Sequence, residues 1–416
     1  MNITSEKILV IDFGSKSAQL YARRVREMNV FCQMAGHEVT QEQVRQMNPV
    51  GLVFTDNPLG NTLSPAIREL GLPILEDLEL TEQGNAKLAA FLKDTCKCAC
   101  DWTMERFAQY AVEDIRRQVG DGRVVCGLSG GVDSSVVAAL IYKAIGNRLS
   151  CIFVDTGLMR KGEPESVIET FSKQFKTDLH ALNSESYFLT KLAGVTDPQA
   201  KRKVIGAAFI DVFADEAKKL GDAQFLAQGT IYPDIIESGI PGCNAKVIKH
   251  HHNVGGLPDD LKFELVEPLK DLFKDEVRQL GLTLGLPAEI VWRQPFPGPG
   301  LGVRCLGDLT KPKLDVLREA DAIVREELAK SGIQASQTFA VLLPVQSVGV
   351  KNGERTYENA VAIRSVQTSD FMSANWTHFP YEVLEAMSDR IIAEVDGINR
   401  VVYDISKKPS ATIEWE

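Results

Sequence analysis

Short apolar runs alternate with amphipathic stretches along the beginning of the chain. The apolar runs read KILVIDFG, VFCQM, GLVFTD and LPILE, and Gly, Asn and Pro punctuate the stretches between them. Runs of this length are typical of buried strands, and strands that alternate with helices form parallel sheets. A last helix over roughly residues 82–95 would close this unit. The pattern predicts a small α/β domain over residues 1–100.

A second α/β pattern follows CKCACDWT, which places a domain boundary near Asp101. A helix from about Thr103 to Val119 leads into the strand RVVCGL, the loop SGGVDSS and the helix VVAALIYKAIG. The strand LSCIFVDTG, the helix EPESVIETFSKQF and a later strand at QFLAQGT continue the alternation. This order predicts a doubly wound parallel sheet over residues 101–300, which binds its ligand at the carboxyl ends of the strands.

The pattern changes after PFPGPGLG, around Gly302. One long helix, KPKLDVLREADAIVREELAKSG, precedes the strand-like runs TFAVLLPV, SVGV, ENAVAIRSV and NRVVYDIS. A helix YEVLEAMSDRIIAEV lies between the last two runs. Residues 301–416 are therefore predicted to form an α+β domain with a short sheet.

Charge and composition exclude several classes of protein. The 56 Asp and Glu against 46 Lys and Arg leave a net charge of -10, which repels polyanions and argues against a nucleic-acid partner. No run of about 18 apolar residues is long enough to cross a membrane, and the N-terminus has no secretory pattern. The eight Cys are too sparse for a disulfide scaffold, so we expect them to be reduced in a cytoplasmic protein.

The loop SGGVDSS carries the sharpest chemical signal. Its glycines let the backbone approach an anion, and the following helix N-terminus supplies partial positive charge where a phosphate would sit. The Lys of a Walker loop is absent, so this is not a P-loop. Asp133 is a candidate Mg²⁺ ligand or helix cap. The candidate ATP-binding residues are Ser129, Gly130, Gly131, Val132, Asp133, Ser134 and Ser135.

In its strand–loop–helix context, SGGVDSS resembles the pyrophosphatase loop of the N-type ATP pyrophosphatases, which split ATP between the α and β phosphates and adenylate a substrate oxygen. The segments AQGTIYPDIIES, IKHHHNVGGLP, LVEPLKDLFKDEVRQLG, PFPGPGLGVR and RVVYDISKKPSATIEWE together resemble the GMP synthase family, which converts XMP to GMP. These segments fall in order from residue 128 to the C-terminus. The resemblance implies a C-terminal domain that binds XMP and forms a homodimer.

The resemblance also implies site residues. Asp234 and Glu237 stand at i and i+3, on one face of a helix that would begin there, and PDIIES resembles the family's catalytic lid. Cationic side chains would neutralise charge building on pyrophosphate. The implied catalytic residues are Asp133, Asp234, Glu237, Lys249 and Lys274. The implied XMP-binding residues are Arg160, Gln337, Arg400, Lys408, Ile413 and Glu414, with Arg400 and Lys408 on the 5′-phosphate.

Two further clusters suggest metal ligands at first sight. The run of residues 250–252 is three consecutive His, and CKCAC holds three Cys. Neither has a second group of ligands at zinc spacing nearby, so we interpret them as loop and linker residues.

The N-terminal domain departs from the family. The segment ILVIDFGSKSAQLYARR resembles the start of a class I glutamine amidotransferase domain, whose Cys nucleophile sits on a strand-to-helix elbow and is activated by His and Glu. Cys32 lies in a strand-like run without such an elbow, and the family's Gly-Gly-Pro oxyanion loop is here residues 56–58, DNP. After LPILE the chain passes directly to TEQGNAKLAAFLKD, which resembles the domain's last helix. We expect a truncated, flavodoxin-like pseudo-glutaminase with a structural role.

The sequence thus predicts an ATP- and Mg²⁺-dependent ligase that aminates XMP through an adenyl intermediate and uses ammonia. A separate glutaminase feeding the same synthetase stays open, as does another ATP pyrophosphatase such as an NAD synthetase or tRNA thiolase. A silent regulator is the third alternative. A silent regulator is expected to have lost motif residues in SGGVDSS or in the terminal segment, and both segments are intact.

Overall fold

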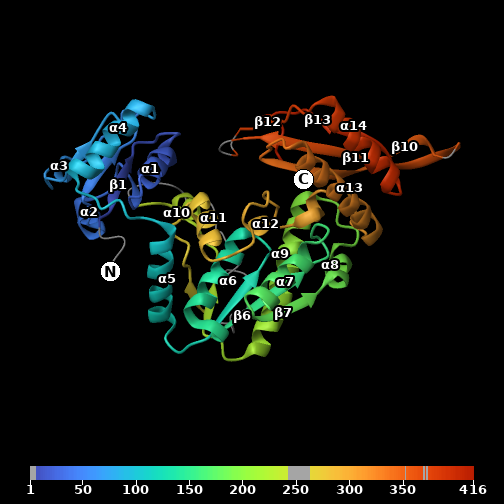
Figure 1. The fold of residues 1–416 in the computed structure, drawn as a ribbon, viewed down its shortest axis with the longest axis horizontal. Coiled ribbons are helices and arrows are strands. Elements are labelled where there is room, and N and C mark those ends of the chain that lie inside the picture. The colour runs from blue at the N-terminus through green and yellow to red at the C-terminus, as the bar shows by residue number, and fades with distance from the viewer. Residues whose placement is uncertain (1–5, 242–262, 352, 369–370, 372) are drawn as a thin grey trace.

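The computed structural model describes residues 6–241, 263–351, 353–368, 371 and 373–416. Figure 1 shows an N-terminal module and a C-terminal domain that each rest on a central α/β domain. This arrangement agrees with the α/β fold class and with the C-terminal α+β domain that the sequence pattern predicts. No helix in the described ranges combines the length and apolarity needed to cross a membrane.

The N-terminal module is a parallel sheet with strand order β2-β1-β3-β4. Its strands coincide with the apolar runs read from the sequence, and the residues of β1 alternate between two small cores. The strand bounds are β1 Ile8–Asp12, β2 Cys32–Gly36, β3 Gly51–Phe54 and β4 Ile74–Leu75. The helices are α1 Ala18–Glu27, α2 Gln41–Met47, α3 Pro65–Arg68 and α4 Glu82–Ala90, which one π-helical turn extends over Phe91–Thr95.

The central domain is a doubly wound parallel sheet with strand order β7-β6-β5-β8-β9. Its strands are β5 Val124–Leu128, β6 Leu149–Asp155, β7 Asp178–Asn183, β8 Phe225–Ala227 and β9 Glu264–Val266. Its helices are α5 Met104–Val119, α6 Val132–Ile145, α7 Glu163–Glu169, α8 Glu185–Leu192, α9 Pro198–Leu220, α10 Tyr232–Ser238, α11 Lys274–Thr283 and α12 Ala288–Val291.

Alternate residues of the central strands face two different cores. On β5, Val124, Cys126 and Leu128 pack with α5, α6 and α11, whereas Val125 faces the core that contains α8 and α9. This second core continues without a break into the C-terminal domain. The central and C-terminal domains therefore share a hydrophobic core, although the change of pattern near Gly302 separates them in sequence.

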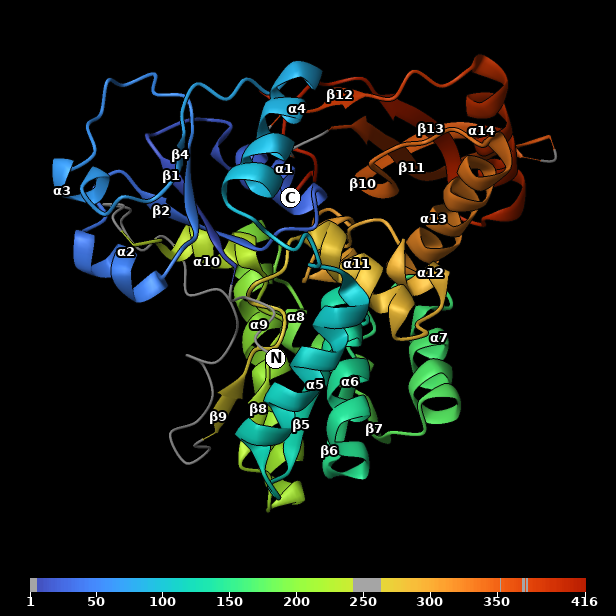
Figure 2. The same cartoon turned by 60° about the vertical axis from the view of Figure 1, so that its left-hand side comes forward.

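The C-terminal domain packs α13 Lys311–Ser331 and α14 Tyr381–Glu394 on one sheet. Strands β10 Gln337–Lys351 and β11 Glu354–Gln367 form a long antiparallel hairpin. Strand β12 Asn375–Trp376 is antiparallel to β11, and β13 Ile398–Asp404 is parallel to it. Figure 2 shows this sheet and the N-terminal sheet on opposite flanks of the region around α11 and α12.

One local expectation was wrong, and several elements were not predicted, the long helix α9 among them. The runs TFAVLLPV and SVGV were expected as separate strands, but both belong to β10, because an irregularity in register between Leu342 and Gln346 lets pairing with β11 resume. The long helix α9 was not recognised from its mixed periodicity. Its end signals were readable, since Asp197 caps its first turn by accepting from the Ala200 amide, a proline follows, and Gly221 ends it.

Candidate active site

The Gly-rich loop joins the carboxyl end of β5 to the first turn of α6. Gly130 has φ of +72°, and a Cβ there would lie 3.0 Å from the Met159 side chain, so glycine suits both the backbone and the space. Ser129 Oγ accepts from the Gly131 amide at 3.3 Å. Ser134 Oγ accepts from the Ser129 amide at 3.3 Å and contacts the Gly131 carbonyl at 3.1 Å. The two serines brace the loop, so its shape is preorganised for an anion.

A cavity of about 240 Å³ opens beside this loop, at the carboxyl ends of β5 and β8. Ser129, Asp133 and Ser134 line its polar side, while Phe209 and Phe213 of α9 line its apolar side. A polar edge next to aromatic rings suits a nucleotide, which has phosphates at one end and a base at the other.

Asp133 and Lys274 meet at the edge of this cavity. Lys274 is the first residue of α11, and its Nζ lies 2.7 and 2.6 Å from the two carboxylate oxygens of Asp133. Both side chains are about one third exposed, at 37% and 31%, so a bound phosphate or cation can reach them. The structure thus brings together two of the residues expected in catalysis.

Ser135, one of the candidate ATP-binding residues, does not present its hydroxyl to the cavity. Its side chain is fully buried within α6, and its Oγ has no hydrogen-bond partner. It lies outside the residues that line the cavity, because it faces the core on the opposite side of the helix from Asp133. Val132 is also buried, so only its backbone is available to a ligand.

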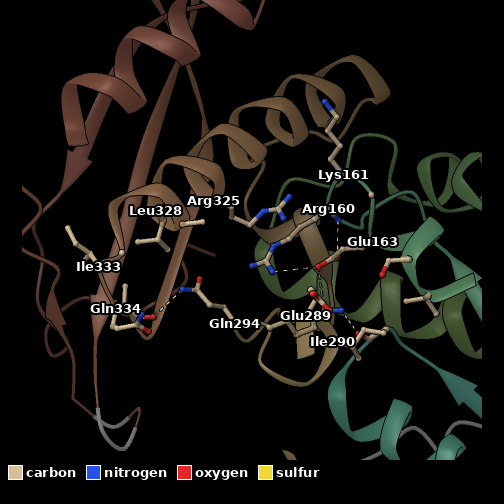
Figure 3. Close-up of a pocket in the computed structure, with 18 residues that line it drawn as sticks. Arg160, Lys161, Glu163, Glu289, Ile290, Gln294, Arg325, Leu328, Ile333 and Gln334 are labelled. Carbon is tan, nitrogen blue, oxygen red and sulfur yellow. Dashed lines mark hydrogen bonds and ion pairs between the residues drawn. The ribbon is translucent and has the colours of Figure 1, made fainter. Parts of the chain in front are cut away.

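A larger cavity of about 510 Å³ lies on the other side of the loop, between α7, α12 and the end of α13. Gly130 lines this cavity, so the Gly-rich loop stands between the two cavities. Figure 3 shows Arg160, Glu163 and Arg325 gathered at one end, and Ile333 and Gln334 at the other. Basic groups and apolar walls in one cavity suit a second phosphorylated ligand.

Arg160 is buried at the inner end of the larger cavity. Its guanidinium lies 3.6 Å from Asp321 and 4.4 Å from the centre of the Phe296 ring. Burial lowers the pKa of Arg160 to about 10, although the nearby Asp321 acts in the opposite direction. Two of its nitrogens, Nε and Nη2, are buried without a hydrogen-bond partner, and Nε faces the Asp321 carboxylate.

Glu414 and Gln337, both expected to bind XMP, lie together, and their role toward XMP stays a prediction. Gln337 Nε2 donates to Glu414 Oε1 at 2.9 Å. Arg304, which sequence reasoning missed, is fully buried and donates to both oxygens of Glu414, at 3.0 and 2.8 Å. Arg304 also lies 3.8 Å from the centre of the Phe339 ring. Its signal in the sequence was its position directly after PFPGPGLGV.

Other buried cations hold the rest of the C-terminal segment. Lys201 is fully buried and donates to Glu416 Oε2 at 2.6 Å. Arg364 donates to the carbonyls of Thr412 at 3.0 Å and Ile413 at 3.3 Å. The Ile413 side chain packs on the core around Phe339. The chain end is ordered because these charge-assisted bonds replace water for its polar groups.

Arg400 and Lys408 do not come together within this chain. Arg400 is exposed on β13, where its Nε donates to Ser347 Oγ at 2.5 Å. Lys408 lies beyond the end of that strand and donates to the Phe371 carbonyl at 2.6 Å. Their shared contact with one 5′-phosphate stays a prediction.

Asp234 and Glu237 lie on α10 and are not among the residues that line the two cavities. Asp234 Oδ2 accepts from the Ile231 amide at 3.0 Å and caps the helix. Their catalytic role stays a prediction. Lys249 and the three consecutive His lie outside the described residues.

The thiols of the N-terminal region are poorly suited to nucleophilic attack. Cys32 is fully buried on β2, and burial raises the pKa of its thiol. Burial also raises the pKa of Cys96 to about 11 and that of Cys98 to about 12. The module has a cavity of about 780 Å³, and the described residues that line it include no Cys and no His. They include Tyr21, Thr55, Asp56 and Arg68.

Two family models match separate parts of this chain. A family model of the GMP synthase C-terminal domain matches residues 326–415, and a family model of NAD synthase matches residues 104–185, which include the Gly-rich loop.

Curated relatives match along the whole chain. The glutamine-hydrolysing GMP synthases of Carboxydothermus hydrogenoformans and Geobacillus kaustophilus are 45% and 44% identical, over 99% and 100% of this chain and 100% of each relative. These alignments extend over 510 and 512 positions, more than the 416 residues of this chain, so a stretch of each relative has no counterpart here. By its full-length identity and its paired ATP-pyrophosphatase and C-terminal parts, the chain belongs to the GMP synthase family.

Proposed function

We propose that this protein aminates XMP to GMP with ATP and free ammonia. The observation that carries the proposal is the position of the Gly-rich loop between two cavities, one lined by Asp133 and the phenylalanines of α9, the other by Arg160. A reaction between two nucleotides needs their reacting atoms to meet, and both cavities adjoin this loop. ATP would occupy the cavity beside Asp133, and XMP the cavity beside Arg160.

The loop and Lys274 would act on the leaving group. In the first step the O2 of XMP attacks the α-phosphate of ATP, and the bond to pyrophosphate breaks. Negative charge builds on pyrophosphate, and the loop amides and the Lys274 ammonium stabilise it without covalent chemistry. Ammonia then attacks C2 and AMP leaves, because AMP is a far better leaving group than a carbonyl oxygen.

Asp133 would hold Mg²⁺. Its carboxylate lines the ATP cavity next to two serine hydroxyls, and Mg²⁺ needs only one or two carboxylates when phosphates supply the other oxygens. Bound there, Mg²⁺ would neutralise charge on the ATP phosphates. Lys274, which pairs with Asp133 in this structure, would then be free to meet pyrophosphate.

Ammonia rather than glutamine is proposed as the nitrogen source. Hydrolysis of glutamine needs a thiolate beside a base, and the described residues around the N-terminal cavity include neither a thiol nor an imidazole. The thiol of Cys32 is buried and its pKa is raised, which opposes ionisation.

A homodimer through the C-terminal sheet is part of the proposal. Val348 and Tyr357 are cross-strand partners on the hairpin and are 47% and 65% exposed, and Val350 nearby is 75% exposed. Such apolar exposure on a long hairpin is typical of an interface. Sedimentation should give twice the mass of one chain.

A steady-state assay tests the nitrogen source. The purified protein receives XMP, ATP and Mg²⁺ with either ammonium or glutamine, and GMP, AMP and pyrophosphate are measured. We expect equal amounts of the three products with ammonium and none with glutamine. Glutamate appearing in step with GMP would contradict the proposal. Turnover of glutamine only after addition of a second protein would favour a separate glutaminase.

A further inference from the structure

A buried ion pair joins the N-terminal module to the start of α11. Arg26, on α1, donates through Nη1 to both carboxylate oxygens of Glu276, each at 3.1 Å. Its Nη2 donates to the carbonyls of Cys32 at 2.8 Å and Asp271 at 3.0 Å. Arg26 and Glu276 are only 6% exposed. The guanidinium therefore ties together two segments that are far apart in sequence.

Glu276 is also the cap of α11. Its Oε2 accepts from the Phe273 amide at 2.8 Å, and its Oε1 accepts from Trp102 Nε1 at 2.5 Å. Arg26 packs against the rings of Phe31 and Trp102, 4.5 and 4.6 Å from their centres, and the two rings also contact each other. Burial disfavours the charged guanidinium, but Glu276, Cys32 and Tyr232 together outweigh this effect, so the pKa of Arg26 is raised. Arg26 thus holds the carboxylate that fixes the first turn of α11.

That first turn carries Lys274. Phe273, directly before it, is 1% exposed and packs in the core of the N-terminal module. Lys274 is therefore held between a buried anchor and the capping carboxylate of Glu276, and its side chain extends from there to Asp133. Backbone anchors on both sides of a lysine restrict where its ammonium can lie.

The same module holds α10, the helix after the β8 end of the ATP cavity. The Met34 amide donates to Tyr232 Oη at 2.5 Å, and the Gly36 amide donates to the Pro241 carbonyl at 2.8 Å. Tyr232 is 4% exposed in the core of the N-terminal module. Figures 1 and 2 show α10 and α11 next to that module. The module therefore packs directly against the helices that follow the β8 end of the ATP cavity.

We propose that Arg26 is a positioning residue for the ATP site: through Glu276 it sets the direction in which Lys274 meets Asp133. The N-terminal module is then a built-in part of the synthetase, independent of any glutaminase chemistry. The inference rests on the proposed function, because it assigns a positioning partner to the lysine that stabilises pyrophosphate.

Two measurements on Arg26→Ala test the inference. The first is GMP formation with saturating ammonium, where we expect kcat to fall about tenfold to hundredfold and KM for XMP to change less than about twofold. The second is acetylation of Lys274 in the free protein, followed by mass spectrometry. Lys274 should react faster than in the wild type, because its ion pair with Asp133 loosens. The exposed Lys173, paired with Glu169 on the surface, is the internal reference.

Three further measurements serve as controls for this test. Arg45→Ala, an exposed arginine in the last turn of α2, should match the wild type in both measurements. Arg26→Lys should recover part of kcat, because it keeps the charge but not the forked geometry. Turnover of the wild type with ammonium tests the proposed function itself. Acetylation of Lys274 needs no turnover, so the two experiments distinguish failure of the proposed function from failure of the inference.

A lower kcat together with faster acetylation of Lys274, in an Arg26→Ala protein that folds, would support the inference. A folded variant with unchanged kcat, or with unchanged Lys274 acetylation, would overturn it, since a merely stabilising contact does not move that lysine. If Arg26→Ala fails to fold by circular dichroism, Trp102→Phe decides by the same two measurements, because it removes the indole donor to Glu276 and keeps an aromatic ring at that position.

Discussion

Lys274 Nζ lies within 2.7 Å of both carboxylate oxygens of Asp133, although 141 positions separate the two residues in the chain. The pair joins the first turn of α6 to the first turn of α11, at the edge of the cavity beside the Gly-rich loop. Two helix N-termini that meet at a cation and an anion form a site where phosphate charge can be stabilised.

Asp133→Asn should reduce AMP and pyrophosphate formation about a hundredfold or more, since the loop loses the charge aimed at Lys274 and Mg²⁺ but keeps its backbone shape. Circular dichroism should be unchanged. Asp121→Asn, at an exposed acid before β5, is the matched control and should behave like the wild type. Pyrophosphate release at the wild-type rate in Asp133→Asn would remove Asp133 from the site.

Lys408→Ala should weaken the use of XMP much more than the use of ATP. A charge-assisted phosphate contact is worth about 1.5–3 kcal/mol, which corresponds to a roughly tenfold to hundredfold rise in KM for XMP. KM values for both nucleotides are measured by varying each in turn. An equal loss for both would point to general unfolding instead.

Glu414→Ala should destabilise the protein by about 3–5 kcal/mol, because it leaves the buried Arg304 guanidinium without its carboxylate. Urea unfolding followed by tryptophan fluorescence measures the change. Glu382→Ala, at an exposed acid in the first turn of α14, is the control and should change stability by less than about 0.5 kcal/mol. A Glu414→Ala protein as stable as the control would mean that water replaces this carboxylate.

With ammonium as the only nitrogen source, the rate at limiting ammonium should rise with pH up to about 9, because the fraction present as NH₃ increases. Cys32→Ser should leave both the rate and this profile unchanged, since the Cys32 thiol is buried with a raised pKa. A glutamine-dependent rate that Cys32→Ser abolished would reveal a hidden glutaminase.

Glu216→Gln should reduce the amount of folding stability that the protein loses as the pH falls. A hydrogen bond from Lys219 and a second one from His180 lower the pKa of Glu216 below its ordinary 4.5, against the opposing effect of burial. The unfolded chain then takes up the proton first, so this stabilisation is present above pH 4.5 and is lost as the pH falls through the folded-state pKa. The free energy of unfolding is measured with urea at several pH values from neutral into acid. It should fall less steeply with decreasing pH in the variant than in the wild type. Equal slopes would contradict the prediction.

The sequence by itself determined the four strands of the N-terminal unit, strands β5, β6 and β8 of the central sheet, and the loop at the carboxyl end of β5, whereas β7 and β9 were not predicted. These elements depend on local patterns: apolar runs of strand length, Gly and Pro punctuation, and a Gly-rich turn before an apolar helix. The ordered C-terminus was also readable, because apolar and polar residues alternate up to Trp415 and Glu416. Asp133, Gln337 and Glu414 were proposed as site residues in this way or by family resemblance.

Only the tertiary structure decided which distant residues meet. Arg304 and Lys201 look like ordinary cations in the sequence, yet both are fully buried because the C-terminal carboxylates of Glu414 and Glu416 reach them. Ser135 belongs to the motif by spacing, but the rotation of α6 turns it into the core. Arg26 gains its partner Glu276 only when two modules pack together. Charge pairing and burial across such separations depend on how the sheets stack, and periodicity along the chain carries no information about that.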